Sequence, residues 1–160
     1  MSDSNGRALI DLLITAAIVD LSTLMTSPHH YFYLFVLSVV TCGITAHPPH
    51  QKLRKTALSA VELVATRHFE DTLAAIEALR KEGYSIAVME TTSLSVSHTR
   101  AVYPKQLALV AGNEVTGVDP RIIEAADLVV QIPTFGVKNS LNVASAVPIV
   151  LFEVLRQWYD

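Results

Sequence analysis

The sequence predicts an α/β fold in which a mostly parallel sheet is flanked by helices. Three short apolar runs are typical of buried strands: residues 84–89, 107–111 and 128–132. Segments with helical signals alternate with these runs, and such alternation indicates a parallel sheet. The chain has 160 residues, of which 51% are apolar and 17% are charged, so it is long enough for a single domain with a real core.

The N-terminal part lacks clear signals for where its elements begin and end. Residues 8–25 are mostly apolar, and we predict a helix from Arg7 to Met25. Asp11 and Asp20 interrupt the apolar run and argue against a membrane span, and the start lacks the basic region of a signal peptide. Tyr31 to Ile44 is too short for a spanning helix of about 20 residues. Its aromatic and β-branched residues favour a buried strand.

A loop with two prolines follows at residues 42–50. His47 and His50 lie in it without a third ligand nearby, so no metal site is predicted. Three basic residues come next: Lys52, Arg54 and Lys55. From composition alone, these residues are predicted to form the exposed start of a helix. The functional alternative is contact with RNA phosphates, because Lys and Arg supply most of the affinity for nucleic acids.

Two helices further along carry start and stop signals. Asp71 or Thr72 can begin the first helix, and Gly83 ends it at the position after the C-cap. Asp119 followed by Pro120 is typical of an N-cap with proline at the first helical position.

The last helix is predicted from Ser140, which can cap it, to Tyr159. Apolar residues occupy nearly every side of this helix, so it must be widely buried. In one small domain the extra apolar face predicts a homodimer, with Leu155 and Trp158 as candidate interface residues. Pro148 inside the helix predicts a kink, because proline removes one backbone hydrogen bond.

Two motifs follow the predicted strands. The first is a turn with Gly112, Glu114 and Gly117. The second is an Ile-Pro pair, a glycine and a Ser-Leu-Asn-Val helix start, formed by Ile132, Pro133, Gly136, Ser140, Leu141, Asn142 and Val143. In order and spacing, the two motifs resemble the SpoU/TrmH branch of the knotted RNA methyltransferases. A Gly-Ile-Thr-x-x-Pro-Pro-His run at residues 43–50, with Lys-Thr-Ala at 55–57, resembles one subgroup of that family.

The resemblance covers roughly residue 43 to the C-terminus. It implies an S-adenosylmethionine-dependent 2′-O-ribose methyltransferase acting on tRNA or rRNA, with a C-terminal trefoil knot and a homodimer paired through the knot region. The pattern alone does not predict the knot, since connections normally do not thread. By resemblance, the loops at the carboxyl ends of the strands contact the cofactor through Met89, Glu90, Thr91, Gly112, Asn113, Gly117, Ile132, Pro133, Gly136 and Leu141. Without the motifs, Ile132 and Leu141 would be ordinary core residues.

Candidate catalytic residues are the polar side chains at the mouth of this site: Glu114, Ser140 and Asn142. Methyl transfer needs the ribose hydroxyl positioned and helped to lose its proton. The alternative for Glu114 is a carboxylate that caps the next helix. The resembled family usually supplies an Arg from a first motif after its first strand. Two alignments of the N-terminus place Asp11 or Ile14 where this Arg belongs, and Arg7 could substitute for it.

The chain is therefore predicted to be a single domain over residues 1–160 with a divergent N-terminal segment, residues 1–42, that lacks the first strand. The leading hypothesis is an RNA 2′-O-methyltransferase impaired by this divergence. The alternative is a non-catalytic cofactor- or RNA-binding relative, and a membrane-associated protein is a distant third. The net charge of −3 counts against strong unaided RNA binding. The single cysteine, Cys42, agrees with a cytoplasmic location.

Overall fold

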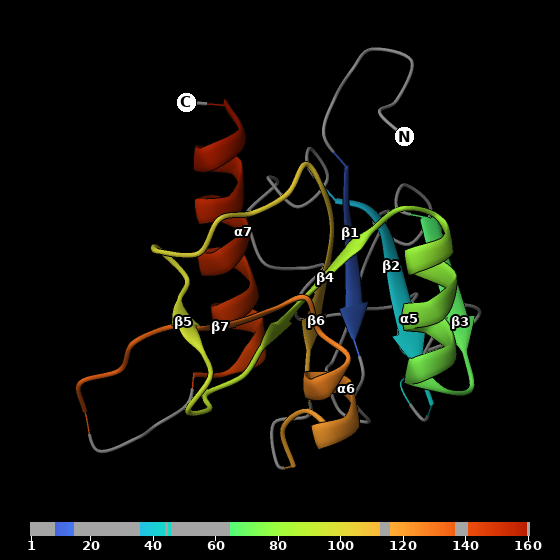
Figure 1. Cartoon of the computed structure of the whole chain (residues 1–160), viewed down its shortest axis with the longest axis horizontal. Coiled ribbons are helices and arrows are strands. Elements are labelled where there is room, and N and C mark those ends of the chain that lie inside the picture. The colour runs from blue at the N-terminus through green and yellow to red at the C-terminus, as the bar shows by residue number, and fades with distance from the viewer. Residues whose placement is uncertain are drawn as a thin grey trace, which may run out of the picture.

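The structure is a computed structural model, and it describes residues 9–14, 36–43, 45, 65–112, 116–136 and 141–159. Within these residues one seven-stranded sheet has the order β3-β2-β1-β6-β4-β7-β5, and all neighbouring strands are parallel (Figure 1). The strands are β1 (Leu9–Ile14), β2 (Val36–Cys42), β3 (Ala65–Phe69), β4 (Ser85–Met89), β5 (Val96–Ser97), β6 (Gln106–Ala111) and β7 (Leu128–Gln131). The helices are α5 (Thr72–Lys81), α6 (Pro120–Glu124) and α7 (Val143–Tyr159). The predicted α/β class with a parallel sheet is confirmed.

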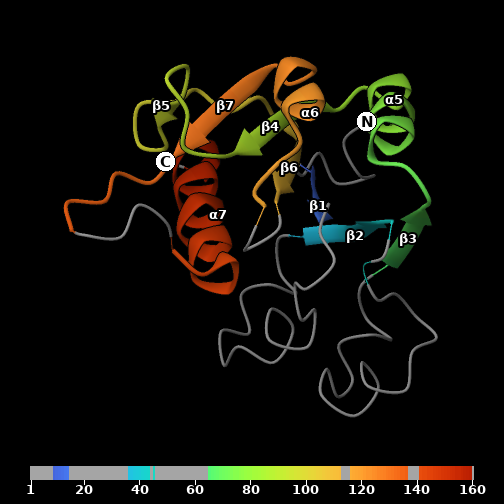
Figure 2. The same ribbon diagram turned by 90° about the horizontal axis from the view of Figure 1, so that it is seen from below.

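Each face of the sheet has its own apolar core, because successive residues of a strand point to opposite faces. α7 covers one face and packs against Val39, Ala87, Leu109 and Val130. α5 and α6 cover the other face and pack against Val40, Ile86, Val88 and Val110. Figure 2 shows α7 on one side of the sheet and the other two helices on the opposite side.

The helix starts with clear capping signals are confirmed. The Asp71 carboxylate accepts a hydrogen bond from Ala74 N at 3.0 Å, and Gly83 after the helix has a φ of +93°. Asp119 caps α6 by accepting from Arg121 N at 2.9 Å. The Arg121 guanidinium also donates to the Asp119 carboxylate and lowers its pKa.

The N-terminal segment contains a strand where a helix was predicted. β1 lies in the middle of the sheet and pairs with β2 on one side and β6 on the other. The predicted helix is therefore wrong over Leu9–Ile14, and so is the predicted lack of a first strand. Central parallel strands are near-continuous apolar runs, which periodicity cannot distinguish from a buried helix. The rest of Arg7 to Met25 lies outside the described residues.

The other predicted strands are confirmed, with β2 inside the run from Tyr31 to Ile44. β3 and β5 were not predicted, and β5 is only two residues long. Burial of Cys42 at the end of β2 raises the pKa of its thiol to about 11. Among the described residues, no helix is both long enough and apolar enough to cross a membrane.

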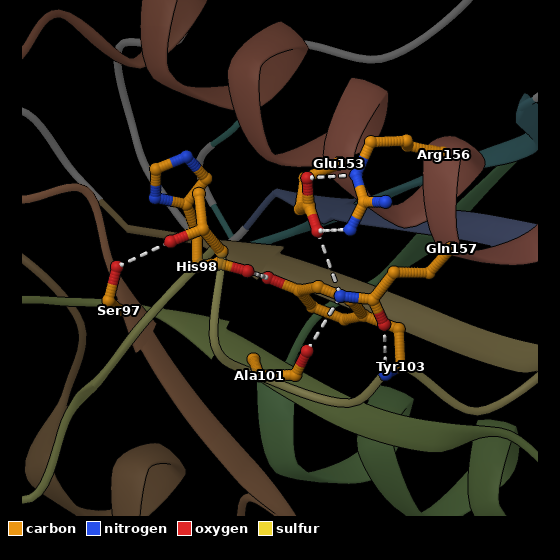
Figure 3. Close-up of polar contacts among 8 residues, drawn as sticks. Ser97, His98, Ala101, Tyr103, Glu153, Arg156 and Gln157 are labelled. Atoms are coloured by element: carbon orange, nitrogen blue, oxygen red, sulfur yellow. Dashed lines mark hydrogen bonds and ion pairs between the residues drawn. The ribbon is translucent and has the colours of Figure 1, made fainter. Parts of the chain in front are cut away.

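β7 lies between β4 and β5 although it follows both in sequence. The chain therefore has to return from β5 past β7 and β4 to reach β6, and the C-terminal half of α7 holds this returning segment (Figure 3). Gln157 accepts from Tyr103 N at 3.2 Å and donates to Ala101 O at 2.8 Å. Arg156 and Gln157 also donate to the Glu153 carboxylate, and these hydrogen bonds lower its pKa to about 2.

Two residues predicted to face a partner subunit lie against this chain's own core. Trp158 is only 8% exposed, and its indole Nε1 donates to Tyr103 O at 3.1 Å. The prediction of Trp158 as an interface residue is therefore wrong. Leu155 is half-buried and packs against the same core.

Candidate cofactor site at the carboxyl edge of the sheet

The three predicted site loops begin side by side. Met89, the last residue of β4, is paired with Ala111 of β6 on one side and with Val130 of β7 on the other. The loops that follow these three strands therefore leave the same edge of the sheet from adjacent positions. Carboxyl ends of parallel strands are where α/β sheets bind ligands. Ile14, at the end of β1, is also paired with Ala111, so the chain leaves β1 at this edge too.

The loop after β6 closes tightly on itself. A Cβ atom on Gly112 would lie 2.5 Å from Val118 Cγ2, 2.6 Å from Gly117 C and 2.7 Å from Val118 N. No side chain fits at these distances, so Gly112 is required by the packing of this loop. The expected role for Gly112 was close approach of a ligand, and the structure adds this second reason.

Glu90, predicted to contact the cofactor, has both carboxylate oxygens engaged by the backbone. Oε1 accepts from Thr91 N at 2.9 Å, and Oε2 accepts from Val118 N at 2.9 Å. The backbone N–H of Glu90 donates to Val130 O at 3.0 Å. One residue thus connects the ends of β4 and β7 with the loop after β6.

The loop after β7 is much more open. Ile132 is half-buried and packs against the core under α7, but residues 133–136 are exposed. Phe135 is 99% exposed, and a Cβ on Gly136 would meet no atom within 4 Å among the described residues.

α7 begins later than predicted, and a different residue caps it. Asn142 Oδ1 accepts from Ala144 N at 2.8 Å, and Asn142 O accepts from Ala146 N at 2.9 Å. Asn142 is therefore the N-cap, whereas Ser140 was predicted for that position. Its side-chain oxygen, a candidate for the reaction, already accepts one backbone hydrogen bond. Leu141, beside it, is 45% exposed.

Comparison with known proteins assigns the chain to a family. The sequence matches the SpoU rRNA Methylase family over residues 34–152, well over half of its length. The chain belongs to this family. The match includes both motifs and the loops after β4, β6 and β7.

Two curated relatives share part of the chain. It is 40% identical over 78 residues to the tRNA (guanosine(18)-2′-O)-methyltransferase of Aquifex aeolicus, which is 49% of this chain and 37% of that protein. It is 30% identical over 100 residues to the protein of the same name from Borreliella burgdorferi, which is 62% of this chain and 46% of that protein. The chain thus spans less than half the length of these two relatives.

Solved structures share the fold over nearly the whole chain. The A. aeolicus TrmH/SpoU tRNA modifying enzyme superposes with a TM-score of 0.76 at 25% identity, over 94% of this chain and 75% of that one. An AdoMet-bound rRNA methyltransferase from Sinorhizobium meliloti superposes with a TM-score of 0.79 at 22% identity, over 97% and 58% respectively.

Several predicted site residues of this family member lie outside the described residues: Arg7, Lys52, Arg54, Lys55, Asn113, Glu114 and Ser140. Their roles stay predictions. Among the described residues, no group of three or more His, Cys, Asp or Glu side chains could hold a metal ion. The sequence reasoning missed Val118, because its hydrogen bond to Glu90 joins residues 28 positions apart and no local pattern marks it.

Proposed function

We propose that the protein is an S-adenosylmethionine-dependent RNA 2′-O-ribose methyltransferase. The observation that carries this proposal is the set of three loops that leave the adjacent strand ends of β4, β6 and β7 and carry both family motifs. The names of the curated relatives, two tRNA 2′-O-methyltransferases, support the substrate class.

The residues at this edge suit the cofactor. An adenosyl group needs apolar walls together with backbone donors and acceptors. Met89, at the end of β4, and Ile132, directly after β7, are half-buried apolar side chains, and the loops that follow them contain exposed residues. The cofactor supplies an electrophilic methyl group on a cationic sulfonium. The chain's part is to hold the adenosyl group with these walls and to position the ribose hydroxyl, for which Glu114 is the candidate.

RNA would be held by electrostatic contacts with phosphates, for which Lys52, Arg54 and Lys55 are the candidates. The net charge of −3 predicts modest affinity that falls steeply with salt. The first motif still lacks an Arg, although the strand before it is present. We therefore expect cofactor binding with methyl transfer that is slow for the isolated chain.

Two measurements test the proposal. Calorimetry with S-adenosylhomocysteine should show binding, and no binding at millimolar ligand by a folded protein would refute it. A tritiated methyl-transfer assay on total tRNA and rRNA at low salt should give a rate more than about tenfold below that of an active family member. Binding without any transfer favours the alternative, a non-catalytic relative. A rate within about tenfold of the control would show that the divergent N-terminus does not impair the reaction.

We also propose a homodimer, now on the outward face of α7. Ile149, Phe152 and Tyr159 are exposed large apolar side chains whose spacing places them on one face of the helix. Light scattering at micromolar concentration should give the mass of a dimer, and Phe152→Asp should shift it toward the monomer. Leu94→Asp is the matched control, because Leu94 is an exposed apolar residue outside this face. A wild-type monomer would refute the dimer.

The trefoil knot of the family is part of the same proposal. Its support is the position of β7 between β4 and β5, since the C-terminal part must pass the returning segment at residues 98–105. An experimental structure with a continuous trace over residues 130–145 tests it, and an unthreaded path would refute it. A cytoplasmic location also stays a prediction, which cell fractionation can test.

A further inference from the structure

We propose that Glu90 is a positioning residue that fixes the base of the loop between β6 and α6, and that this role needs both of its carboxylate oxygens. The inference rests on the proposed function, because that loop carries Gly112 and the candidate catalytic Glu114. It assigns Glu90 a role through the loop, whereas the resemblance places it in contact with the cofactor.

The two carboxylate oxygens of Glu90 accept hydrogen bonds from two different loops. Oε1 accepts from the backbone N–H of Thr91 in the loop after β4, and Oε2 accepts from that of Val118 in the loop after β6, both at 2.9 Å. The backbone of Glu90 is itself anchored by its hydrogen bond to Val130 O at 3.0 Å. The carboxylate therefore projects from a fixed strand end and reaches across to the neighbouring loop.

The loop is shaped to receive this carboxylate. Gly117 has a φ of +69°, and a Cβ on it would lie 2.6 Å from Glu90 Oε2. On its other side, Val118 fills the space where a Cβ of Gly112 would be. Gly112 at the start of the loop and Gly117–Val118 at its end are thus pressed together, with the Glu90 carboxylate against the second of them.

The chemistry requires a carboxylate. Glutamate offers two acceptor oxygens, whereas glutamine offers one oxygen and an NH₂ group that can only donate. In Glu90→Gln one of the two backbone N–H groups would face another donor and lose its partner. Hydrogen bonds to an ionised acceptor are also stronger than those between neutral groups. Neutral glutamine, almost the same size, should therefore loosen the loop without changing the packing around it.

Hydrogen exchange of single amides, followed by NMR on the full chain, tests this role directly. In the wild type the Val118 amide should be protected. In Glu90→Gln the exchange of the Val118 or Thr91 amide should rise by at least about tenfold, while that of the β4 amide of Val88 stays unchanged. Glu82→Gln is the matched control, because Glu82 is an exposed carboxylate that accepts from the Arg67 guanidinium and not from a backbone N–H of the site loops.

Calorimetry with S-adenosylhomocysteine on the same three proteins links the loop to the site. We expect Glu90→Gln to bind at least about tenfold more weakly than the wild type, and Glu82→Gln to bind as the wild type does. Unchanged binding by Glu90→Gln, or a wild-type Val118 amide that exchanges as fast as an unfolded one, would overturn the inference. If the wild type protects Val118 but does not bind the ligand, the proposed function fails and the positioning role in the loop stands. If Glu90→Gln does not fold, the exchange rate of the Val118 amide in the wild type still tests the inference, because fast exchange would overturn it.

Discussion

The loops after β6 and β7 both carry glycines of the family motifs, yet the fold restrains them very differently. Gly112 and Gly117 lie where a Cβ would collide with backbone or with the Glu90 carboxylate. Gly136 lies in the open, with no described atom within 4 Å of the position of a Cβ. A motif glycine can thus be required by the packing of the described residues, as Gly112 is, or lie where no described atom requires it, as Gly136 does.

The position of each strand explains the difference. β6 lies between β1 and β4, so the loop that leaves it has to turn over occupied strand ends in a confined space. β7 has only the two-residue β5 beyond it, and residues 133–136 of the loop that follows it are exposed. The loop after β6 is closed by contacts within it and with Glu90, whereas the one after β7 is anchored at its ends by Ile132 and Asn142.

Gly112→Val should have the largest effect. The branched side chain would overlap the backbone of Gly117 and Val118, and overpacking of this kind typically costs about 1–3 kcal/mol, occasionally more. We expect the urea midpoint to fall accordingly, together with loss of S-adenosylhomocysteine binding. The urea midpoint of Gly112→Ala, which adds only the Cβ, should lie between those of Gly112→Val and the wild type. An unchanged midpoint for the valine variant would mean that this loop is not closed as described.

Gly117→Ala comes next. Alanine at a φ of +69° is strained by roughly 1–2 kcal/mol, and its Cβ would press on Glu90 Oε2. Gly83→Ala is the matched control, because Gly83 also has a positive φ but its nearest atoms belong to the flexible side chain of Gln106. Denaturant unfolding should show a larger loss of free energy of unfolding for Gly117→Ala than for Gly83→Ala. Adding Glu90→Ala to it should recover part of the difference, and strict additivity of the two changes would argue against the contact.

Local signals predicted most of the C-terminal half, because its strands and caps are encoded by neighbouring residues. Asp71 and Asp119 cap the helices they were predicted to begin. β1 was mistaken for a helix, because its state is decided by pairing with residues 36–41 and 106–111, which lie far away in sequence. An apolar run does not reveal such pairing.

The candidate site shows the same limit. The apolar runs correctly placed the three strands from which the loops leave, but the sequence did not predict the contacts that shape the loops. The bond between Glu90 and Val118 joins two parts of the chain that only the sheet brings together. Trp158 was a candidate interface residue because an all-apolar helix does not show which side its own sheet covers.

Asn142→Ala should lower stability moderately. It tests the N-cap of α7, which holds the C-terminal end of the loop after β7. Removing the side chain leaves the N–H of Ala144 without its acceptor, and loss of an N-cap typically costs about 1 kcal/mol. Thermal unfolding should show a lower melting temperature, and Asn142→Asp, which also caps well, should stay close to the wild type. Equal losses in the two variants would indicate that the amide has another role.

Gly136→Ala should have the smallest effect on stability. Gly136 has no positive φ, and its Cβ would meet no described atom within 4 Å, so no contact with the described residues opposes the change. Alanine also restricts the unfolded chain, which at a compatible position stabilises a protein by about 0.4–1 kcal/mol. We therefore expect a free energy of unfolding equal to or slightly above that of the wild type. If the glycine serves a ligand or a partner, the same variant should weaken S-adenosylhomocysteine binding or dimerisation while the fold is unharmed. A loss of stability above about 1 kcal/mol would contradict the open loop, and it would place Gly136 in the same class as Gly112.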